Sequence, residues 1–338
     1  MADVSLTLVG LRRVGLSLGL ALRRYQESPR AAHRFTITGT DQDASVGKEA
    51  QKRGMIDAYE RNLSAACAEA DIVFIDAPLM ALREHLKALG PVVKSGCVIL
   101  ETSILKQPPI EWASSYLPES AYLVGLAPVL NPDILHDTSL DELESARADL
   151  FTNGNLYIAP SATCAAEAVQ LASDLVGLLG LEPHFLEPAE HDGFAAAVEL
   201  LPALLSLALV GTASSAPSWK DMRRLTNPTF ALSTMALTKN PEDLVESLRL
   251  DRESVLHYLD SALEQLHALR RLLAEEDPAA LREALANIST EYVKWLSQRE
   301  SGRWRDRPSV ETPPIRANLL QGLFGSFLVR GKKDDEKD

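Results

Sequence analysis

Polar and apolar positions in the first half of the chain follow two alternating patterns. Short, almost continuous apolar runs are typical of strands buried on both faces, and apolar residues three or four apart are typical of helices. The predicted strands cover residues 4–9, 35–40, 71–76, 97–100, 122–126, 156–158 and 184–186, and the predicted helices cover 16–25, 45–53, 79–89 and 162–179. This alternation predicts an α/β fold with a parallel sheet covered on both faces.

The pattern changes after residue 188. Residues 191–211 are apolar on nearly every side, which predicts a buried helix. Leucines three or four apart predict a helix over 251–273, and the helical pattern continues over 281–295. We therefore predict an all-α domain over residues 189–300, whose excess of apolar faces suits a homodimer.

The last part of the chain, residues 301–338, differs from both domains. It is predicted to be a linker, an apolar segment at 317–329 and a charged tail. The apolar segment has the composition of a helix that docks on a partner or a membrane surface. Packing on the chain itself or on a second copy is the favoured interpretation, because Gly322 and Gly325 interrupt the apolar face.

Composition narrows the possible partners. Among 338 residues there are 47 acidic and 34 basic side chains, so the formal net charge of −13 argues against nucleic acid. Three cysteines, far apart and without metal-ligand spacing, favour a reduced, cytoplasmic compartment and no metal site. No uninterrupted apolar run is long enough for a membrane span; the nearest case, 200–210, is too short and contains Pro202, so no transmembrane segment is expected.

A glycine motif links the first predicted strand to the first helix. Residues 10–15 read Gly-Leu-Arg-Arg-Val-Gly, in the place of the dinucleotide-binding pattern GxGxxG. Gly10 suits the tight turn and Gly15 the close packing of helix on strand, but Arg12 replaces the glycine that lets the backbone approach a pyrophosphate. Two interpretations are balanced: the Arg12 side chain moves aside or contacts a phosphate, or the fold persists without tight nucleotide binding. Either way, residues 1–188 are predicted to form a Rossmann-type domain.

An acidic residue, Asp41, ends the second predicted strand. A carboxylate there can bind the ribose hydroxyls of a dinucleotide, and it favours NAD over NADP because it repels a 2′-phosphate. An ordinary surface aspartate at a strand end is the alternative. The candidate cofactor-binding residues are Gly10, Arg12, Val14, Gly15, Asp41 and Pro78.

The order of elements, with Gly-Leu-x-x-Val-Gly-Leu-Ser at 10–17, resembles the prephenate/arogenate dehydrogenase family of tyrosine biosynthesis. Further matching stretches are 54–57, 70–73 and 146–151, together with His191-Asp192 and the residues that follow, so the resemblance covers roughly residues 4–300. It implies an NAD(P)-binding domain followed by a helical dimerisation domain. The implied reaction is an oxidative decarboxylation, in which hydride leaves the carbon that bears the ring hydroxyl and carbon dioxide leaves the ring.

The chain departs from this family at the catalytic positions. The family's histidine in Gly-Gly-His-Pro, which polarises the hydroxyl, corresponds to Ala127, and alanine cannot accept a proton. The family's Ser-His-Leu-Pro-His corresponds to residues 199–203, Glu-Leu-Leu-Pro-Ala, so both of its histidines are missing. A family serine corresponds to Ile104, whereas Lys106 is retained.

Two polar positions match the family. Asp221 and Arg224 correspond to its Asp-x-x-Arg, in which the arginine binds a substrate carboxylate. Together with Lys220 and Arg223, Arg224 has the charge for an anionic-ligand pocket. A solvated charged turn is the slightly favoured alternative.

Lys106 and Glu199 are the candidate catalytic residues. Glu199 lies on an apolar helix that is expected to face the cleft, which is costly unless the carboxylate is paired, with Lys106 or Arg224 as partner. A role for Glu199 as a base with a raised pKa ranks below this pairing. Of the histidines, His136 is nearest to the altered motif but is expected on an exposed loop, and His191 is expected to be structural.

Two functional hypotheses remain. The first is an NAD(P)-dependent dehydrogenase of this family that works with changed catalytic groups or on another small-molecule substrate. The second is a catalytically inactive member that binds a ligand or a partner enzyme. The missing histidines favour the second, and the retained Asp41, Lys106, Asp221 and Arg224 support the first. The sequence leaves open whether the chain is an enzyme, which substrate it takes, and whether it uses NAD or NADP.

Overall fold

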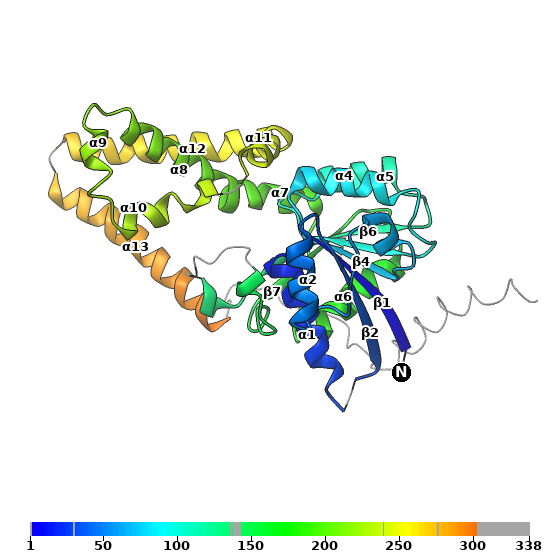
Figure 1. The fold of residues 1–338 in the computed structure, drawn as a ribbon. Helices are drawn as coiled ribbons and strands as arrows, with labels where there is room; N and C mark the ends of the chain where they lie inside the picture. The colour runs from blue at the N-terminus through cyan, green and yellow to red at the C-terminus, as the bar shows by residue number, and fades with distance from the viewer. Residues whose placement is uncertain are drawn as a thin grey trace, which may run out of the picture.

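The computed structural model describes residues 2–29, 31–135, 137, 143–238, 240–275 and 277–302. The chain forms an α/β domain from which a helical arm extends (Figure 1). The predicted linker, apolar segment and charged tail beyond residue 302, and the candidate His136, lie outside the described residues.

The α/β domain contains an eight-stranded sheet in the order β3-β2-β1-β4-β5-β6-β7-β8. Every neighbouring pair is parallel except β6 and β7, which run antiparallel. The bounds are β1 Ala2–Val9, β2 His33–Thr40, β3 Ala58–Tyr59, β4 Ile72–Ile75, β5 Val98–Glu101, β6 Tyr122–Val129, β7 Asn155–Pro160 and β8 Pro183–Phe185.

Helices cover both faces of this sheet, as predicted. Leu16 and Leu22 of α1 and Leu175 of α6 pack on one face, and Leu82 and Leu86 of α4 pack on the other. The helices are α1 Arg13–Gln26, α2 Ala44–Lys52, α3 Leu63–Cys67, α4 Leu79–Leu89, α5 Gln107–Tyr116 and α6 Ala166–Leu178, with short 3₁₀ turns η1 Pro132–Ile134 and η2 Leu143–Ser145. The prediction of a Rossmann-type α/β domain followed by a helical domain is confirmed.

The arm begins with a long bent helical segment. It consists of α7 Pro188–Ala195, a π-helical turn η3 at Ala196–Leu200, and α8 Leu201–Ser214. Pro202 lies just after the π turn, and because proline has no N–H, the normal helical hydrogen bond is lost there and the backbone widens locally. The arm continues with α9 Trp219–Met222, α10 Pro228–Ser233, η4 Met235–Thr238, α11 Pro241–Leu250, α12 Arg252–Ala274 and α13 Pro278–Ser301.

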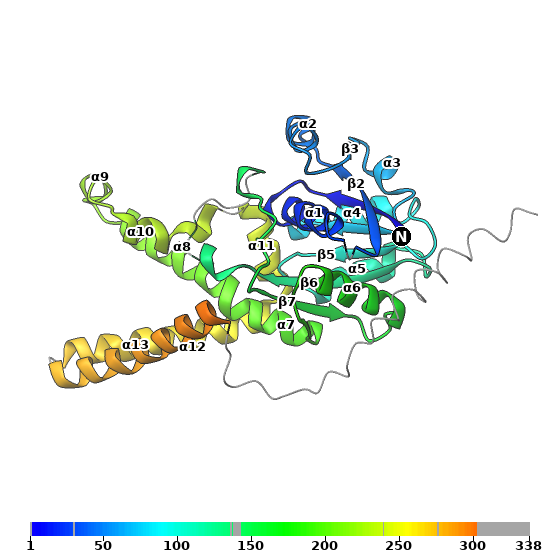
Figure 2. The same cartoon turned by 90° about the horizontal axis from the view of Figure 1, so that it is seen from below.

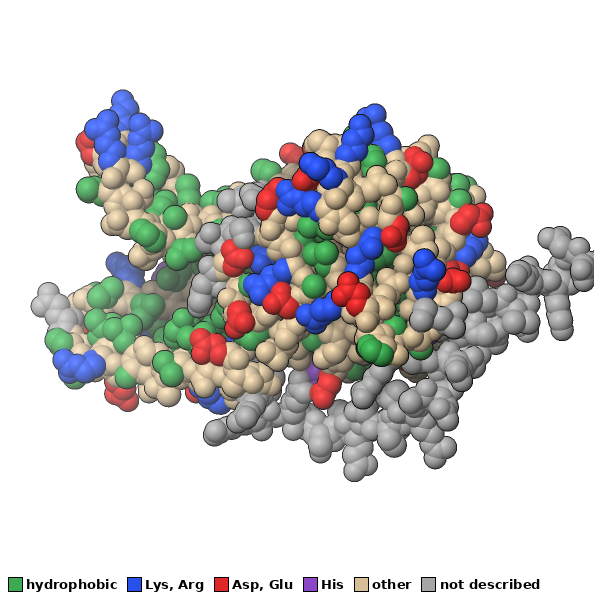
Figure 3. Space-filling model, turned by 60° about the horizontal axis from the view of Figure 1, so that its bottom comes forward, with side chains coloured by type: hydrophobic (Ala, Val, Ile, Leu, Met, Phe, Trp, Pro, Cys, Tyr) green, Lys and Arg blue, Asp and Glu red, His purple; other side chains and the backbone are tan. Residues whose placement is uncertain are grey.

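The arm exposes much of its apolar surface, and Figure 3 shows hydrophobic side chains gathered along it. Val198 is 68% exposed, Leu273 65% and Val293 63%. The prediction that residues 191–211 form a buried helix is therefore wrong for the single chain. The segment Pro188–Ser214 has the length and composition of a membrane span, and only 28% of its most apolar stretch is buried. Apolar helix surface that is exposed to this extent indicates an interface with a partner that covers it.

Candidate functional site

The turn between β1 and α1 has the shape that the glycine motif predicts. Gly10 has a φ of +83°, and a Cβ built on it would lie 2.2 Å from the carbonyl oxygen of Asp76. Any other residue would therefore clash with the end of β4 as well as strain the backbone. The helix α1 begins at Arg13, and Arg12 occupies the position before it in an extended conformation, with φ −102° and ψ −177°.

Asp41 connects the end of β2 to this turn. Its Oδ2 accepts a hydrogen bond from the Leu11 amide at 2.9 Å, and its Oδ1 accepts one from the Asp43 amide at 2.9 Å. The carboxylate is thus held beside the glycine turn, at the edge of the sheet where parallel strands present their carboxyl ends. This is the place where an acidic residue binds ribose in Rossmann-type domains.

A second carboxylate, that of Asp76, lies on the other side of the turn. Asp76 directly follows β4, and its Oδ2 accepts a hydrogen bond from the amide of Gly15 at 2.8 Å. Sequence reasoning missed this residue, although an aspartate at the end of an apolar strand was a visible signal. Pro78, a predicted cofactor residue, immediately precedes α4.

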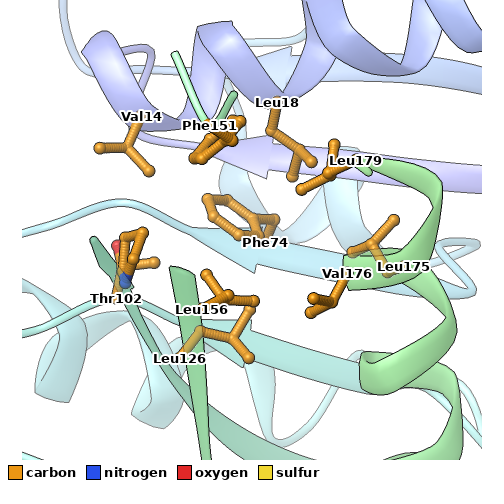
Figure 4. Close-up of a pocket in the computed structure, with 11 residues that line it drawn as sticks. Val14, Leu18, Phe74, Thr102, Leu126, Phe151, Leu156, Leu175, Val176 and Leu179 are labelled. Atoms are coloured by element: carbon orange, nitrogen blue, oxygen red, sulfur yellow. The ribbon is translucent and has the colours of Figure 1, made fainter. Parts of the chain in front are cut away.

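Val14 lies apart from the Asp41 and Asp76 carboxylates and serves the core. Its side chain lines a small cavity of about 10 Å³ between α1, the sheet and α6, together with Leu18, Phe74 and Phe151 (Figure 4). The lining is almost entirely apolar and the space is that of a single water at most. The cavity is therefore part of the core, and Val14 contributes packing beneath the turn.

Two features at the end of β1 and β2, the Gly10 turn and the Asp41 carboxylate, fit the binding of a dinucleotide. The Gly10 turn leaves no room for a Cβ, and the Asp41 carboxylate keeps lone pairs for further hydrogen bonds. Within the described residues, no group of three or more His, Cys, Asp or Glu side chains is placed to hold a metal ion.

Lys106 is fully buried in an ion pair. Its Nζ lies 3.0 Å from Glu101 Oε1 and donates to the Ser103 carbonyl at 2.5 Å. Strand β6 packs directly over the pair, since a Cβ at Gly125 would lie 2.7 Å from Lys106 Cδ. The ammonium is neutralised inside the protein, and sequence reasoning did not foresee Glu101 as its partner.

Glu199 lies elsewhere. It belongs to the π-helical turn, on an exposed side of the arm. The predicted pairing of Glu199 with Lys106 is wrong, because Lys106 is paired with Glu101. The expected burial of Glu199 is wrong for the single chain, because its side chain is exposed among the residues that the structure describes. Leu200 and Ala203, which the resemblance predicts to replace two family histidines, are buried.

Ala127 belongs to a row of side chains that crosses three strands. In the antiparallel pairing of β6 and β7, Ala127 is opposite Tyr157, and in the parallel pairing of β7 and β8, Tyr157 is beside His184. The Tyr157 and His184 rings are 5.6 Å apart between centroids. Because side chains alternate along a strand, the row lies on the same face as Gly125, the face above the Lys106 pair.

The two domains are joined by carboxylates at helix N-termini. Asp192 of α7 accepts hydrogen bonds from the amides of Lys106 and Gln107, at 2.6 and 2.9 Å, and so caps α5. His191 Nδ1 lies 3.0 Å from the same carboxylate. Asp243 of α11 caps α4 in the same way, accepting from the Met80 amide at 2.9 Å. His191 therefore lies within the domain junction.

Asp221 and Arg224 are far from all of these groups in the single chain. They lie in and just after α9, at the end of the arm that points away from the α/β domain in both Figure 1 and Figure 2. Both are exposed, and basic side chains gather at this tip (Figure 3). One chain alone does not bring them to Asp41, Lys106 or Ala127.

The fold and this edge of the sheet define a two-domain protein in which a nucleotide-binding domain carries a helical domain. The chain belongs to the prephenate dehydrogenase family. Residues 18–182 match the nucleotide-binding domain of prephenate dehydrogenase, and residues 187–287 match its dimerization domain. The exposed apolar helices of the arm thus belong to a dimerization domain.

Relatives with assigned names are distant in sequence. Prephenate dehydrogenase of Bacillus subtilis (strain 168) is 24% identical over 279 residues, which is 81% of this chain and 71% of the relative. Cyclohexadienyl dehydrogenase of Zymomonas mobilis is 22% identical over 274 residues, covering 80% and 89%.

Solved structures share the fold over most of their length. Prephenate dehydrogenase from A. aeolicus, in complex with hydroxyphenyl propionate and NAD+, has a TM-score of 0.73 at 19% identity, covering 87% of this chain and 98% of the other. Arogenate dehydrogenase from Synechocystis has a TM-score of 0.65 at 21% identity, covering 86% and 99%.

Proposed function

We propose that this chain is an NAD-dependent dehydrogenase of the prephenate/arogenate type. It acts as a cytoplasmic homodimer on a small cyclohexadienyl substrate or in a closely related oxidation. The observation that carries the proposal is the family match over both domains, which coincides with a glycine turn and an acidic residue at the carboxyl edge of the sheet.

The cofactor would lie across the Gly10 turn, with its ribose at Asp41. A carboxylate at this position favours NAD, since it would repel the 2′-phosphate of NADP. When bound, NAD+ supplies the hydride acceptor of the reaction. The Asp41 carboxylate organises the site by holding the Leu11 amide, and so fixes the turn against β2.

The substrate carboxylate is assigned to Arg224, with Asp221 beside it. Arginine binds carboxylates through paired hydrogen bonds. Because α9 lies at the far end of the arm, these residues serve a site that a second copy of the chain completes. The exposed apolar faces of α8, α12 and α13 support this dimer.

Proton transfer is the step in which this chain differs from its family. A positioned general base typically contributes about 10²–10⁴ to the rate, and Ala127 cannot provide one. On the same row, Tyr157 and His184 are the side chains that can exchange a proton. We assign to them the proton that leaves the substrate hydroxyl, with Lys106 kept as a buried positioning residue.

The second candidate is a non-catalytic member of the family that binds a ligand or a partner enzyme. It is favoured by Ala127 together with the closed Lys106–Glu101 pair, since neither can exchange a proton with a substrate.

Calorimetry and a turnover assay separate the two candidates. The purified dimer is titrated with NAD+ and NADP+, and reduced cofactor is then followed with prephenate and with arogenate. The dehydrogenase proposal expects tighter binding of NAD+ than of NADP+ and turnover of at least one substrate. Binding of prephenate or arogenate without any turnover would favour the non-catalytic candidate.

A further inference from the structure

Asp76 stands between the glycine turn and the first helix. Its backbone carbonyl faces Gly10, and its Oδ2 holds the Gly15 amide at 2.8 Å. The hydroxyl of Thr102, which directly follows the neighbouring strand β5, lies 3.4 Å from Asp76 Oδ1. The carboxylate is therefore fixed at the N-terminus of α1 by groups from two other elements.

The start of this helix is where a Rossmann-type domain binds phosphate. The first amides of a helix have no partner within the helix, and the helix dipole adds a partial positive charge, so an anion binds there readily. Here one of those amides already donates to a carboxylate of the chain itself. A pyrophosphate must displace this carboxylate or lie beside a like charge.

We infer that Asp76 is a built-in anion at the N-terminus of α1, and that it lowers the affinity of the glycine turn for the pyrophosphate of a dinucleotide. The inference rests on the proposed function only in taking a dinucleotide as the ligand.

The residue before the helix is a second feature of this part of the turn. Arg12 places a Cβ where the motif has the glycine that lets the backbone approach the pyrophosphate. Its backbone is extended and needs no glycine, so the change is tolerated by the fold. On its phosphate side the turn thus departs from the motif at Arg12 and faces the Asp76 carboxylate, whereas the Gly10 turn and Asp41 are kept.

The test is calorimetric titration of the full-length protein and its Asp76→Asn variant with NAD+. Asparagine keeps the size of the side chain and an oxygen for the Gly15 amide but removes the charge. We expect NAD+ to bind at least tenfold more tightly to the variant. Adenosine, which carries no phosphate, should bind both proteins equally.

Asp71→Asn is the matched control. Asp71 lies just before the opposite end of β4, where its carboxylate accepts from the Ser5 amide at 2.8 Å and pairs with Lys94. The Asp71→Asn substitution removes the same charge far from the turn, and it should leave the affinity for NAD+ unchanged. Circular dichroism and the thermal midpoint show whether each variant is folded, and Asp76→Ser replaces Asp76→Asn if the latter is not.

Two results overturn the inference. One is a folded Asp76 variant that binds NAD+ no more tightly than the wild type does. The proposed function still stands in that case if the wild type binds NAD+ and reduces it with prephenate or arogenate. The other is a gain that adenosine shares, because the gain then does not depend on phosphate. Tight NAD+ binding by the variant alone, with no turnover by the wild type, would support the inference and refute the proposed dehydrogenase.

Discussion

The ammonium of Lys106 lies 3.0 Å from Glu101 Oε1, and the two side chains are 0% and 1% exposed. The pair stands between α5, β5 and β6, directly below the row that contains Ala127. The Lys106 ammonium is thus enclosed, and Ala127 on the row above it has no group that can exchange a proton.

Breaking this pair should destabilise the fold strongly. Lys106→Met leaves the Glu101 carboxylate buried without its partner, which typically costs about 3–5 kcal/mol. The free energy of unfolding in urea measures the loss. Lys52→Met, which removes a lysine 80% exposed, is the control and should change stability little. A loss below about 1 kcal/mol for Lys106→Met would contradict the role of the pair.

The cap that joins the two domains should be measurable locally. In Asp192→Ala the amides of Lys106 and Gln107 lose their acceptor, and loss of a helix cap costs about 0.5–2 kcal/mol. Hydrogen exchange should become faster in the first turn of α5. In Asp43→Ala, which removes the cap of α2, exchange in α5 should stay unchanged. Unaltered exchange in α5 of Asp192→Ala would show that the cap is not needed.

Two buried thiols predict a loss of stability at alkaline pH. Burial raises the pKa of Cys67 and of Cys97 from 9.0 to about 12. In the unfolded chain these thiols ionise near their ordinary pKa, so their contribution to stability is fully present below pH 9. It is lost progressively as the pH rises toward about 12.

Urea unfolding at pH 8 and pH 10.5, values on either side of the ordinary thiol pKa of 9.0, measures this effect. Cys97→Ala should show a smaller decrease between the two pH values than the wild type. Equal decreases would mean that the buried thiols do not contribute.

The row beside Ala127 predicts a kinetic effect of Tyr157. If Tyr157 takes part in proton transfer, Tyr157→Phe should lower kcat about 10²-fold with little change in KM. Tyr122→Phe, at the other end of β6, is the control for loss of a tyrosine hydroxyl from this sheet. Equal kcat values for Tyr157→Phe and the wild type would remove Tyr157 from the mechanism.

The sequence was sufficient for seven of the eight strands and for α1, α2, α4 and α6, because buried strands and amphipathic helices differ in period. It did not predict β3, α3 or α5, which are short or carry little periodic pattern. It was also sufficient for the Gly10 turn, since only glycine fits against the end of β4. The register of β6 on β7 was not predictable, because an antiparallel pair within a parallel sheet depends on how distant segments pack. Hence Tyr157 and His184 had no assigned place beside Ala127.

The exposure of the arm had a different cause. A helix that is apolar on all sides has the same pattern whether its own chain or a second chain covers it, so 191–211 was predicted to be buried. The partner of Lys106 was missed because Glu101 ends a short apolar strand, where a single acidic residue gives no sign of facing inward.

We propose that this family member transfers hydride to NAD+ despite Ala127. The most direct test is the initial rate of NAD+ reduction with prephenate and with arogenate, for the wild-type dimer and for Ala127→His side by side. We expect a measurable rate for the wild type with at least one substrate, and a higher rate for Ala127→His, which restores a proton acceptor. If neither protein reduces NAD+ with either substrate while both are folded dimers, the dehydrogenase account is contradicted.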